Sequence, residues 1–180
     1  MIRRAAVRGD RLELHVRPAQ RLDVPALLAL RDAALRGIGE PYSPAQIVRW
    51  VDVTTEDDLR IAIDEADDAV FCAAIEGVED ARVVGFARLD YDTSVHLLGL
   101  FVDPAWQRRG IGTALLDAAH ARCRARQVAR VVVAASLNAV PFYARHGYDS
   151  IERFDWRPSG AGDEPPIAAL KMVKDLHSGR

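Results

Sequence analysis

Cysteine is scarce in this chain of 180 residues, which contains only Cys72 and Cys123. Two cysteines in apolar surroundings provide neither a disulfide framework nor the paired thiols of a zinc motif, and the histidines show no ligand spacing with acidic or thiol residues. Long hydrophobic runs are also missing, so the chain has no stretch of transmembrane length and no signal-peptide segment at its start. These absences predict buried thiols, no metal, no membrane association and a cytoplasmic location.

The chain also lacks an excess of charge of one sign. It has 24 Lys and Arg against 26 Asp and Glu, a net charge of −2. This balance argues against broad affinity for nucleic acids, which normally requires a basic surface. The arginines at 122, 124 and 126 are interpreted, with Asp117 and His120, as the solvated face of a helix. Repeats, low-complexity segments and composition shifts are absent, which favours a single domain over residues 1–180 with its core at about 12–176.

Periodicity predicts an alternation of helices and strands, with the first ten residues loose. Helices are expected from about Asp23 to Gly37, from Pro44 after the capping residue Ser43, and over 55–65. Strands are expected at 11–17, 70–75, 83–91, 95–102, 130–137, 150–156 and 167–173, with an antiparallel hairpin turning at 77–81 and a Pro- and Gly-rich loop over 157–166.

The segment from Leu100 to Thr113 is the most informative part of the sequence. An apolar strand runs into a turn that contains Gly110 and Gly112 and opens directly into an amphipathic helix. Glycines allow the backbone to approach a ligand, and the free N–H groups of the first helical turn attract anions. A P-loop and a dinucleotide-binding fingerprint are both excluded, because the chain lacks Gly-Lys-Ser/Thr and the third glycine. The pattern therefore predicts a phosphate-binding helix end flanked by Arg108 and Arg109.

A second motif follows this helix. Residues 130–137 form a β-branched apolar run, and 138–148 have the features of a short helix. Asn138 is a suitable N-cap, Pro141 falls in the first turn, and Gly147 lies where a left-handed residue ends a helix. Within that helix, Tyr143 has two interpretations, as a core aromatic residue beside Phe142 or as a catalytic phenol.

Together the two motifs resemble the cofactor site of the GNAT-type N-acetyltransferases, whose acetyl-CoA signature matches Gln107-x-x-Gly110-x-Gly112 here. The resemblance spans most of the chain and is most specific over residues 95–148. It implies an α/β (α+β) fold, a mixed and mostly antiparallel sheet of about six to seven strands flanked by helices, with a splayed parallel pair at the cofactor site. It also implies acetyl-CoA as co-substrate and these cofactor-binding residues: Leu100, Phe101, Val102, Gln107, Arg108, Arg109, Gly110, Ile111, Gly112, Thr113, Asn138 and Tyr143.

The activity implied by the resemblance is direct transfer of an acetyl group to an amine in a ternary complex. Tyr143 corresponds to the phenol near the thioester sulfur, and a phenol of pKa about 10 can donate a proton to a departing thiolate of pKa about 8.5. Members often place a carboxylate base on the central strand, but residues 95–100 have none. His96 is the only titratable side chain there, and it is interpreted either as the base or as a histidine without a catalytic task. Glu40, Tyr42 and Asp90 are further candidates for the base.

The acceptor region of the family corresponds to residues 37–43, where Glu40 could attract a cationic amine and Tyr42 could pack on it, or both could belong to a solvated loop. The acceptor itself, a small molecule or a protein amino group, is left open, as is the acyl chain. Dimerisation is common among members. Two other functions are considered: an acyl-CoA-binding regulatory or scaffold module without turnover, favoured by the missing carboxylate, and transfer from aminoacyl-tRNA, disfavoured by the acidic balance.

Overall fold

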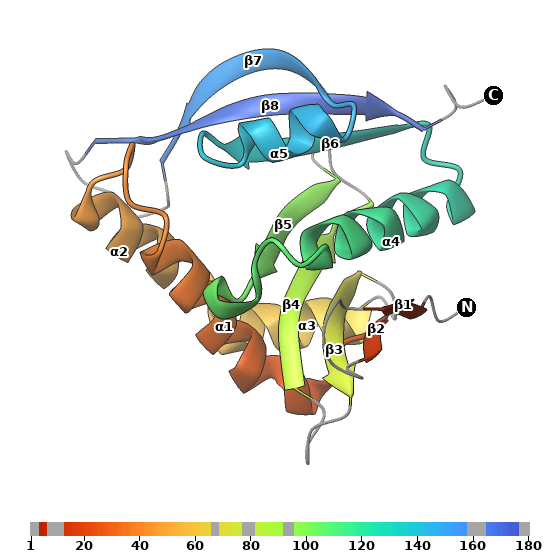
Figure 1. Ribbon diagram of the computed structural model, residues 1–180. Coiled ribbons are helices and arrows are strands. Elements are labelled where there is room, and N and C mark those ends of the chain that lie inside the picture. Colours follow the sequence, from red (N-terminus) through yellow and green to blue (C-terminus); the bar gives the residue numbers. More distant parts are fainter. Residues whose placement is uncertain are drawn as a thin grey trace.

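The computed structural model describes residues 4–6, 13–65, 69–76, 82–91, 96–157 and 165–176. A mixed sheet of eight strands forms its centre, in the order β1-β2-β3-β4-β5-β6-β8-β7 (Figure 1). The strands, in chain order, are β1 (Arg4–Ala6), β2 (Glu13–Pro18), β3 (Val70–Glu76), β4 (Arg82–Leu89), β5 (Leu97–Val102), β6 (Arg130–Ser136), β7 (Asp149–Trp156) and β8 (Ile167–Asp175).

The predicted fold class is confirmed, and the sheet contains one further short strand, β1, at its edge. Residues 4–6 pair antiparallel with β2, although the first ten residues were expected to be loose. Three residues are too few to show an alternating pattern, so this strand depends on its partner rather than on its own sequence. The hairpin of β3 and β4 is antiparallel as expected, while its turn at 77–81 lies outside the described residues, as does most of the 157–166 loop.

The helices are α1 (Val24–Arg36), α2 (Pro44–Asp52), α3 (Glu56–Glu65), α4 (Ile111–Ala125) and α5 (Val140–Arg145). Helix α2 begins where Ser43 predicts it, because the Ser43 side chain and that of Gln46 cap each other's backbone N–H groups. Helix α1 ends at Gly37, also as expected. None of the described helices has the length and apolar character needed to cross a membrane.

Two apolar clusters lie on opposite faces of the β2–β5 half of the sheet. Helix α4 packs on one face, where Leu115, Leu116 and Ala119 are fully buried. Helices α1 and α3 pack on the other face through Leu27, Leu30 and Leu59, together with Phe86 of β4. Burying both faces of these strands explains their near-continuous apolar sequences, since only partly exposed strands alternate.

The sheet is weakest between β5 and β6. This is its parallel pair, and it is recorded at a single register position, Leu97 opposite Val133. By contrast, β6 pairs with β8 over the whole strand from Arg130 to Ser136. Beyond Leu97, β5 therefore diverges from β6 and leaves its backbone facing a gap, which is the splayed parallel pair that the sequence predicts.

Candidate active site

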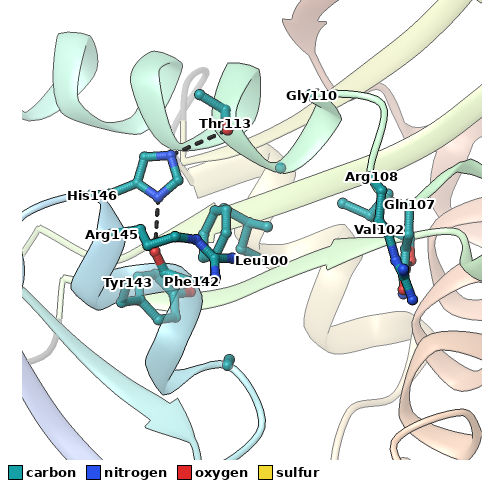
Figure 2. Close-up of a pocket in the computed structure, with 12 residues that line it drawn as sticks. Leu100, Val102, Gln107, Arg108, Gly110, Thr113, Phe142, Tyr143, Arg145 and His146 are labelled. Atoms are coloured by element: carbon teal, nitrogen blue, oxygen red, sulfur yellow. Dashed lines mark hydrogen bonds between the residues drawn. The ribbon is translucent and has the colours of Figure 1, made fainter.

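A cavity of about 430 Å³ lies between the start of α4, the end of β5 and helix α5 (Figure 2). We call it the α4–α5 cavity. Strand β5 contributes Leu100 and Val102 to its lining, and the loop and first turn of α4 contribute Gln107, Arg108, Gly110, Gly112 and Thr113. The remaining lining residues come from α5 and the residue before it: Ala139, Phe142, Tyr143, Arg145 and His146.

The loop before α4 has the geometry of an anion-binding turn. Gly110 is the N-cap residue and adopts a left-handed conformation, with φ of 85°. Arg108 also has a left-handed backbone conformation, with φ of 60°, which residues other than glycine rarely adopt. Left-handed residues next to a helix start turn successive N–H groups toward one side of the loop and form a concave site for anions. The loop therefore presents unpaired N–H groups and the positive end of the α4 dipole to the cavity.

Gly112 allows α5 to approach α4. A Cβ atom at this position would lie 3.4 Å from Cε2 of Phe142 and 3.8 Å from Cγ2 of Val102. These are ordinary contact distances, so alanine fits here, while any larger side chain would extend into the cavity. The glycine thus matters for the space at the helix start rather than for backbone conformation.

The two predicted arginines lie in different places. Arg108 lines the cavity, as Figure 2 shows, together with Gln107, whose side chain reaches the carbonyl of Val102 at 3.4 Å. Arg109 instead stacks on the ring of Trp106, with its guanidinium carbon 4.8 Å from the ring centroid. Of the two cations, the structure brings only Arg108 into the α4–α5 cavity.

Tyr143 lies at the opposite end of the cavity from the α4 loop and is 5% exposed. Its ring makes edge contacts with Phe142 and Tyr148 at 5.2 and 5.4 Å between centroids. Burial raises the pKa of Tyr143 above its ordinary value, so the phenol keeps its proton at neutral pH. Among the described residues no hydrogen-bond partner is recorded for its hydroxyl, which leaves the O–H available to a molecule in the cavity.

The helix predicted within residues 138–148 is α5, Val140–Arg145, and it begins later than predicted. Asn138 lies in the turn, and the N-cap is Ala139, which makes no side-chain cap. Asn138 is exposed and does not line the cavity, although its neighbour Ala139 does. The end of the helix agrees with expectation, because Gly147 is left-handed with φ of 76°.

Several lining residues were not among the predicted site residues. Phe142, Arg145 and His146 have the i, i+3, i+4 spacing that places side chains on one helical face, and this spacing was the signal that could have identified them. His146 accepts a hydrogen bond from the Thr113 hydroxyl at Nε2, and its Nδ1 lies 2.8 Å from the carbonyl of Phe142. A carbonyl only accepts, so Nδ1 carries the proton and Nε2 is the acceptor.

The predicted base and acceptor residues lie outside this cavity. His96 precedes β5 and its Nδ1 accepts a hydrogen bond from the backbone N–H of Val132 at 3.3 Å. Burial lowers the pKa of His96, and the charge of Asp90 opposes this shift. Tyr42 is buried, where its hydroxyl accepts a hydrogen bond from the N–H of Leu137 and donates one to the carbonyl of Ala168, while Glu40 is exposed. Tyr42 therefore joins the segment before α2 to β8 and to the end of β6 rather than belonging to a solvated loop.

The side chains of β5 alternate between the two faces of the sheet. Leu100 and Val102 line the α4–α5 cavity, and Phe101 points to the other face, where its ring lies 5.3 Å from that of Phe86. Ile111 is fully buried, so it offers a ligand only its main chain. Within the part of the chain that the structure describes, no group of three or more potential ligand side chains is placed to hold a metal ion.

Comparisons with known proteins agree with this geometry. Residues 38–154 match the family model described as an acetyltransferase (GNAT) domain. The chain is 32% identical over 113 residues to the uncharacterized N-acetyltransferase YafP of Escherichia coli K12, and the aligned part covers 62% of this chain and 65% of YafP. The chain thus matches slightly less than two thirds of this curated relative.

Solved structures share the fold over nearly the whole chain. A GCN5-related N-acetyltransferase from Rhodopseudomonas palustris is 27% identical, with a TM-score of 0.75 and coverage of 95% of this chain and 98% of that one. The PaiA N-acetyltransferase of Thermoplasma acidophilum, solved in complex with coenzyme A, is 19% identical, with a TM-score of 0.68 and coverage of 90% and 98%.

Proposed function

This chain belongs to the GNAT acetyltransferase family, and from that premise we propose that it transfers the acetyl group of acetyl-CoA directly to an amine acceptor in a ternary complex. We further propose that residues 1–180 act as one domain. The observation that carries the proposal is the α4–α5 cavity, which has an anion-binding helix start at one end and the free hydroxyl of Tyr143 at the other. Acetyl-CoA carries phosphate groups and a thioester, so one end of the cavity would bind the phosphates and the other would face the thioester.

Coenzyme A would bind with its pyrophosphate at the loop before α4. The N–H groups of residues 107–113 and the Arg108 side chain provide donors, and the helix dipole adds to the attraction. The pantetheine arm of the cofactor would follow the gap beside β5, past Gly112 and Phe142, and bring the thioester toward Tyr143. Asn138, exposed in the turn before α5, is proposed as a polar contact at the edge of this path.

The transfer begins when a neutral amine attacks the thioester carbonyl, which forms a C–N bond and places negative charge on the carbonyl oxygen. Successive N–H groups of a strand point to opposite edges, and that of Asp103 donates to the carbonyl of Val84 in β4, so the N–H of Phe101 also faces β4. The N–H groups of Leu100 and Val102 face the gap where β5 has left β6, and they would stabilise this oxyanion. The C–S bond then breaks, and the Tyr143 hydroxyl donates its proton to the departing sulfur. The proton lost by the amine passes to water and restores the phenol, so the products are an amide and the free thiol of coenzyme A.

The geometry argues against His96 as a base that contacts the amine. His96 does not line the α4–α5 cavity, and its Nδ1 is already engaged by the N–H of Val132. Asp90 lies next to His96, since its N–H donates to the carbonyl of His96 at 2.8 Å. We therefore propose that water in the cavity removes the proton of the attacking amine.

Calorimetric titration with acetyl-CoA, followed by thiol release in the presence of amines, amino acids and peptides, tests the proposal. Saturable binding together with release for one acceptor class supports it. Binding without release for any acceptor would favour an acyl-CoA-binding module without turnover, which the absence of a carboxylate side chain in Leu97–Val102 also suggests. Lack of binding would overturn the proposal, provided that the protein is folded by circular dichroism.

A further inference from the structure

A second cavity, of about 180 Å³, lies on the opposite face of β5 and has a different chemical character. We call it the aromatic cavity. Its lining includes the rings of Trp50, Trp156, Phe86 and Phe101 and the side chains of Arg31 and Arg88. Such a combination of aromatic rings and cations, without any Asp or Glu in the lining, fits an apolar molecule that carries a negative charge.

The two cavities share the backbone of β5 as a common wall. Gly99 and Phe101 line the aromatic cavity, whereas Leu100 and Val102 line the α4–α5 cavity. The same stretch of β5 carries the backbone N–H groups that we propose bind the carbonyl oxygen of the thioester. A molecule in the aromatic cavity is therefore separated from the proposed reacting carbon by one strand of the sheet, and the gap beside β5 would allow the two to meet.

Arg88 is placed to bind a carboxylate beside this wall. It lies opposite Gly99 in the pairing of β4 with β5 and on the same face as Phe86. Gly99 has no side chain to occupy the adjacent space, and a Cβ atom there would lie 2.6 Å from the ring of Phe101. Among the described residues, Arg88 has no recorded hydrogen bond or ion pair, so its guanidinium donors are available to a ligand.

Arg31 supplies a second, fixed positive charge. It is 4% exposed and donates hydrogen bonds to the carbonyls of Trp50 and Val51, which are among the last carbonyls of α2. Its guanidinium carbon lies 5.9 Å from the centroid of the Phe101 ring. Asp32 pairs with Arg31 at 3.3 Å but does not line the cavity. Asp58 lies near Arg88, yet its carboxylate is engaged by the N–H and hydroxyl of Thr55.

The rings complete the site for an apolar side chain. Trp50 and Trp156 meet edge-to-face at 6.3 Å between centroids, and Phe101 packs on Phe86. These rings come from α2, β7, β4 and β5, so a ligand that touches them all is held from several directions. Positive charge in this cavity also disfavours an ammonium group, which promotes the neutral amine that can attack a thioester.

We propose that the acceptor is an amino acid-like molecule, a primary amine with an aromatic or large apolar side chain and a carboxylate bound by Arg88. This inference rests on the proposed acetyl transfer. Its amine nitrogen would reach the thioester through the gap between β5 and β6 and form the C–N bond as the C–S bond breaks. The amine proton passes to water, and coenzyme A leaves as the thiol. The side chain would lie on Trp50 and Trp156.

The test compares acceptors that differ only at the carboxylate: L-phenylalanine, L-phenylalaninamide and 2-phenylethylamine, each with saturating acetyl-CoA. We expect kcat/KM to be at least tenfold higher for phenylalanine than for the other two. The Arg88→Gln variant should raise KM for phenylalanine at least tenfold and leave 2-phenylethylamine unchanged. Arg130→Gln is the matched control, because Arg130 is exposed on β6 and makes only a surface ion pair with Asp175.

Binding can be measured without turnover, from the change in tryptophan fluorescence when N-acetyl-L-phenylalanine is added to the free protein. Saturable quenching that weakens in Trp156→Phe and in Arg88→Gln supports the inference. If acetyl-CoA binds and uncharged or cationic amines are acetylated equally well or better than phenylalanine, the acceptor inference is overturned and the proposed function stands. If acetyl-CoA does not bind, both are overturned.

Discussion

The hydroxyl of Thr113 donates a hydrogen bond of 3.1 Å to Nε2 of His146, and this bond joins the first turn of α4 to the end of α5 across the α4–α5 cavity (Figure 2). The other ring nitrogen of His146 is held by the carbonyl of Phe142. The imidazole is therefore fixed at both nitrogens and sets the separation of the two cavity walls. The two residues are 33 positions apart in the sequence, and their bond links the α4 end of the cavity to the helix that carries Tyr143.

Replacing Tyr143 with phenylalanine should lower kcat roughly 100-fold, because general acid assistance to a leaving group typically contributes at least this much. The affinity for acetyl-CoA should change little, since the ring and its contacts with Phe142 and Tyr148 remain. Steady-state kinetics and calorimetry measure the two effects separately. Tyr91→Phe removes the same atom outside the cavity and is the control. Unchanged kcat in Tyr143→Phe would exclude the phenol as the proton donor.

Replacing Gly112 with larger residues should weaken acetyl-CoA binding progressively, and the loss should grow with the size of the side chain. Alanine meets Phe142 at an ordinary contact distance, so Gly112→Ala should fold normally and bind acetyl-CoA only a few fold more weakly. Valine extends into the cavity and should reduce affinity by at least 100-fold without lowering the melting temperature by more than a few degrees. Calorimetry and thermal unfolding of both variants check this. Normal affinity in Gly112→Val would contradict the assignment of the loop.

The two neighbouring arginines should differ in their effect on the cofactor. Arg108→Gly removes the charge that lines the cavity and suits the left-handed backbone at this position, so it tests charge without adding strain. We expect roughly tenfold weaker binding of acetyl-CoA, equivalent to about 1.4 kcal/mol, and a smaller dependence on salt. Arg109→Ala, which loses only the stack on Trp106, should bind as the wild type does. Equal losses in both variants would mean that the cation is not positioned as the structure shows.

Acid should destabilise the protein through His120. This side chain is 5% exposed and bonded to the Tyr148 hydroxyl at 2.8 Å. Burial, with help from Lys174 and Arg124, lowers its pKa from 6.5 to about 4. Between these two values the unfolded chain takes up a proton that the folded protein does not, so the free energy of unfolding falls as the pH decreases, by about 3 kcal/mol over the window.

Urea unfolding at pH 7, 5.5 and 4.5 measures this dependence. In His120→Gln the amide can still bond Tyr148 but does not titrate, so the free energy of unfolding should vary less with pH over this range. An identical pH dependence in both proteins would show that other groups cause the loss of stability.

The pH dependence of turnover should not depend on the presence of His96. Because His96 lies outside the α4–α5 cavity, His96→Gln should keep kcat within about threefold of the wild type and should leave the acidic limb of the kcat/KM profile in place. A loss of that limb in the variant would restore His96 as the base, acting through a chain of water molecules.

Local signals in the sequence were sufficient to predict most of the elements. The capping pair of Ser43 and Gln46 marks the start of α2, and Gly147 marks the end of α5. Gly110 and Gly112 drew attention to the loop and first turn of α4, which line one end of the α4–α5 cavity. These features are contained within a few neighbouring residues, which is why sequence alone reveals them.

Features that depend on distant partners were not predictable. His120 was expected in solvent, yet it shares a helical face with Leu116 and Cys123 and finds its hydrogen-bond partner in Tyr148. Arg122 was also assigned to a solvated face, but its guanidinium carbon lies 4.0 Å from the centroid of the Phe71 ring. In both cases a tertiary contact holds against the protein a polar side chain that the local pattern places in solvent.

Strands β5 and β6 pair at a single register position, Leu97 opposite Val133. The sheet therefore behaves as two rigid parts, which we call plates, joined by one short junction. One plate consists of β1 to β5, and the other of β6, β8 and β7, and within each plate neighbouring strands pair at several positions. Widening the angle between the plates breaks almost no ladder hydrogen bonds, so its energetic cost is set by side-chain packing and by the Thr113–His146 bond. Hydrogen exchange should accordingly resolve two protected blocks. The amides of Leu100 and Val102, which face the gap, should exchange faster than either block and slow when a ligand fills the gap.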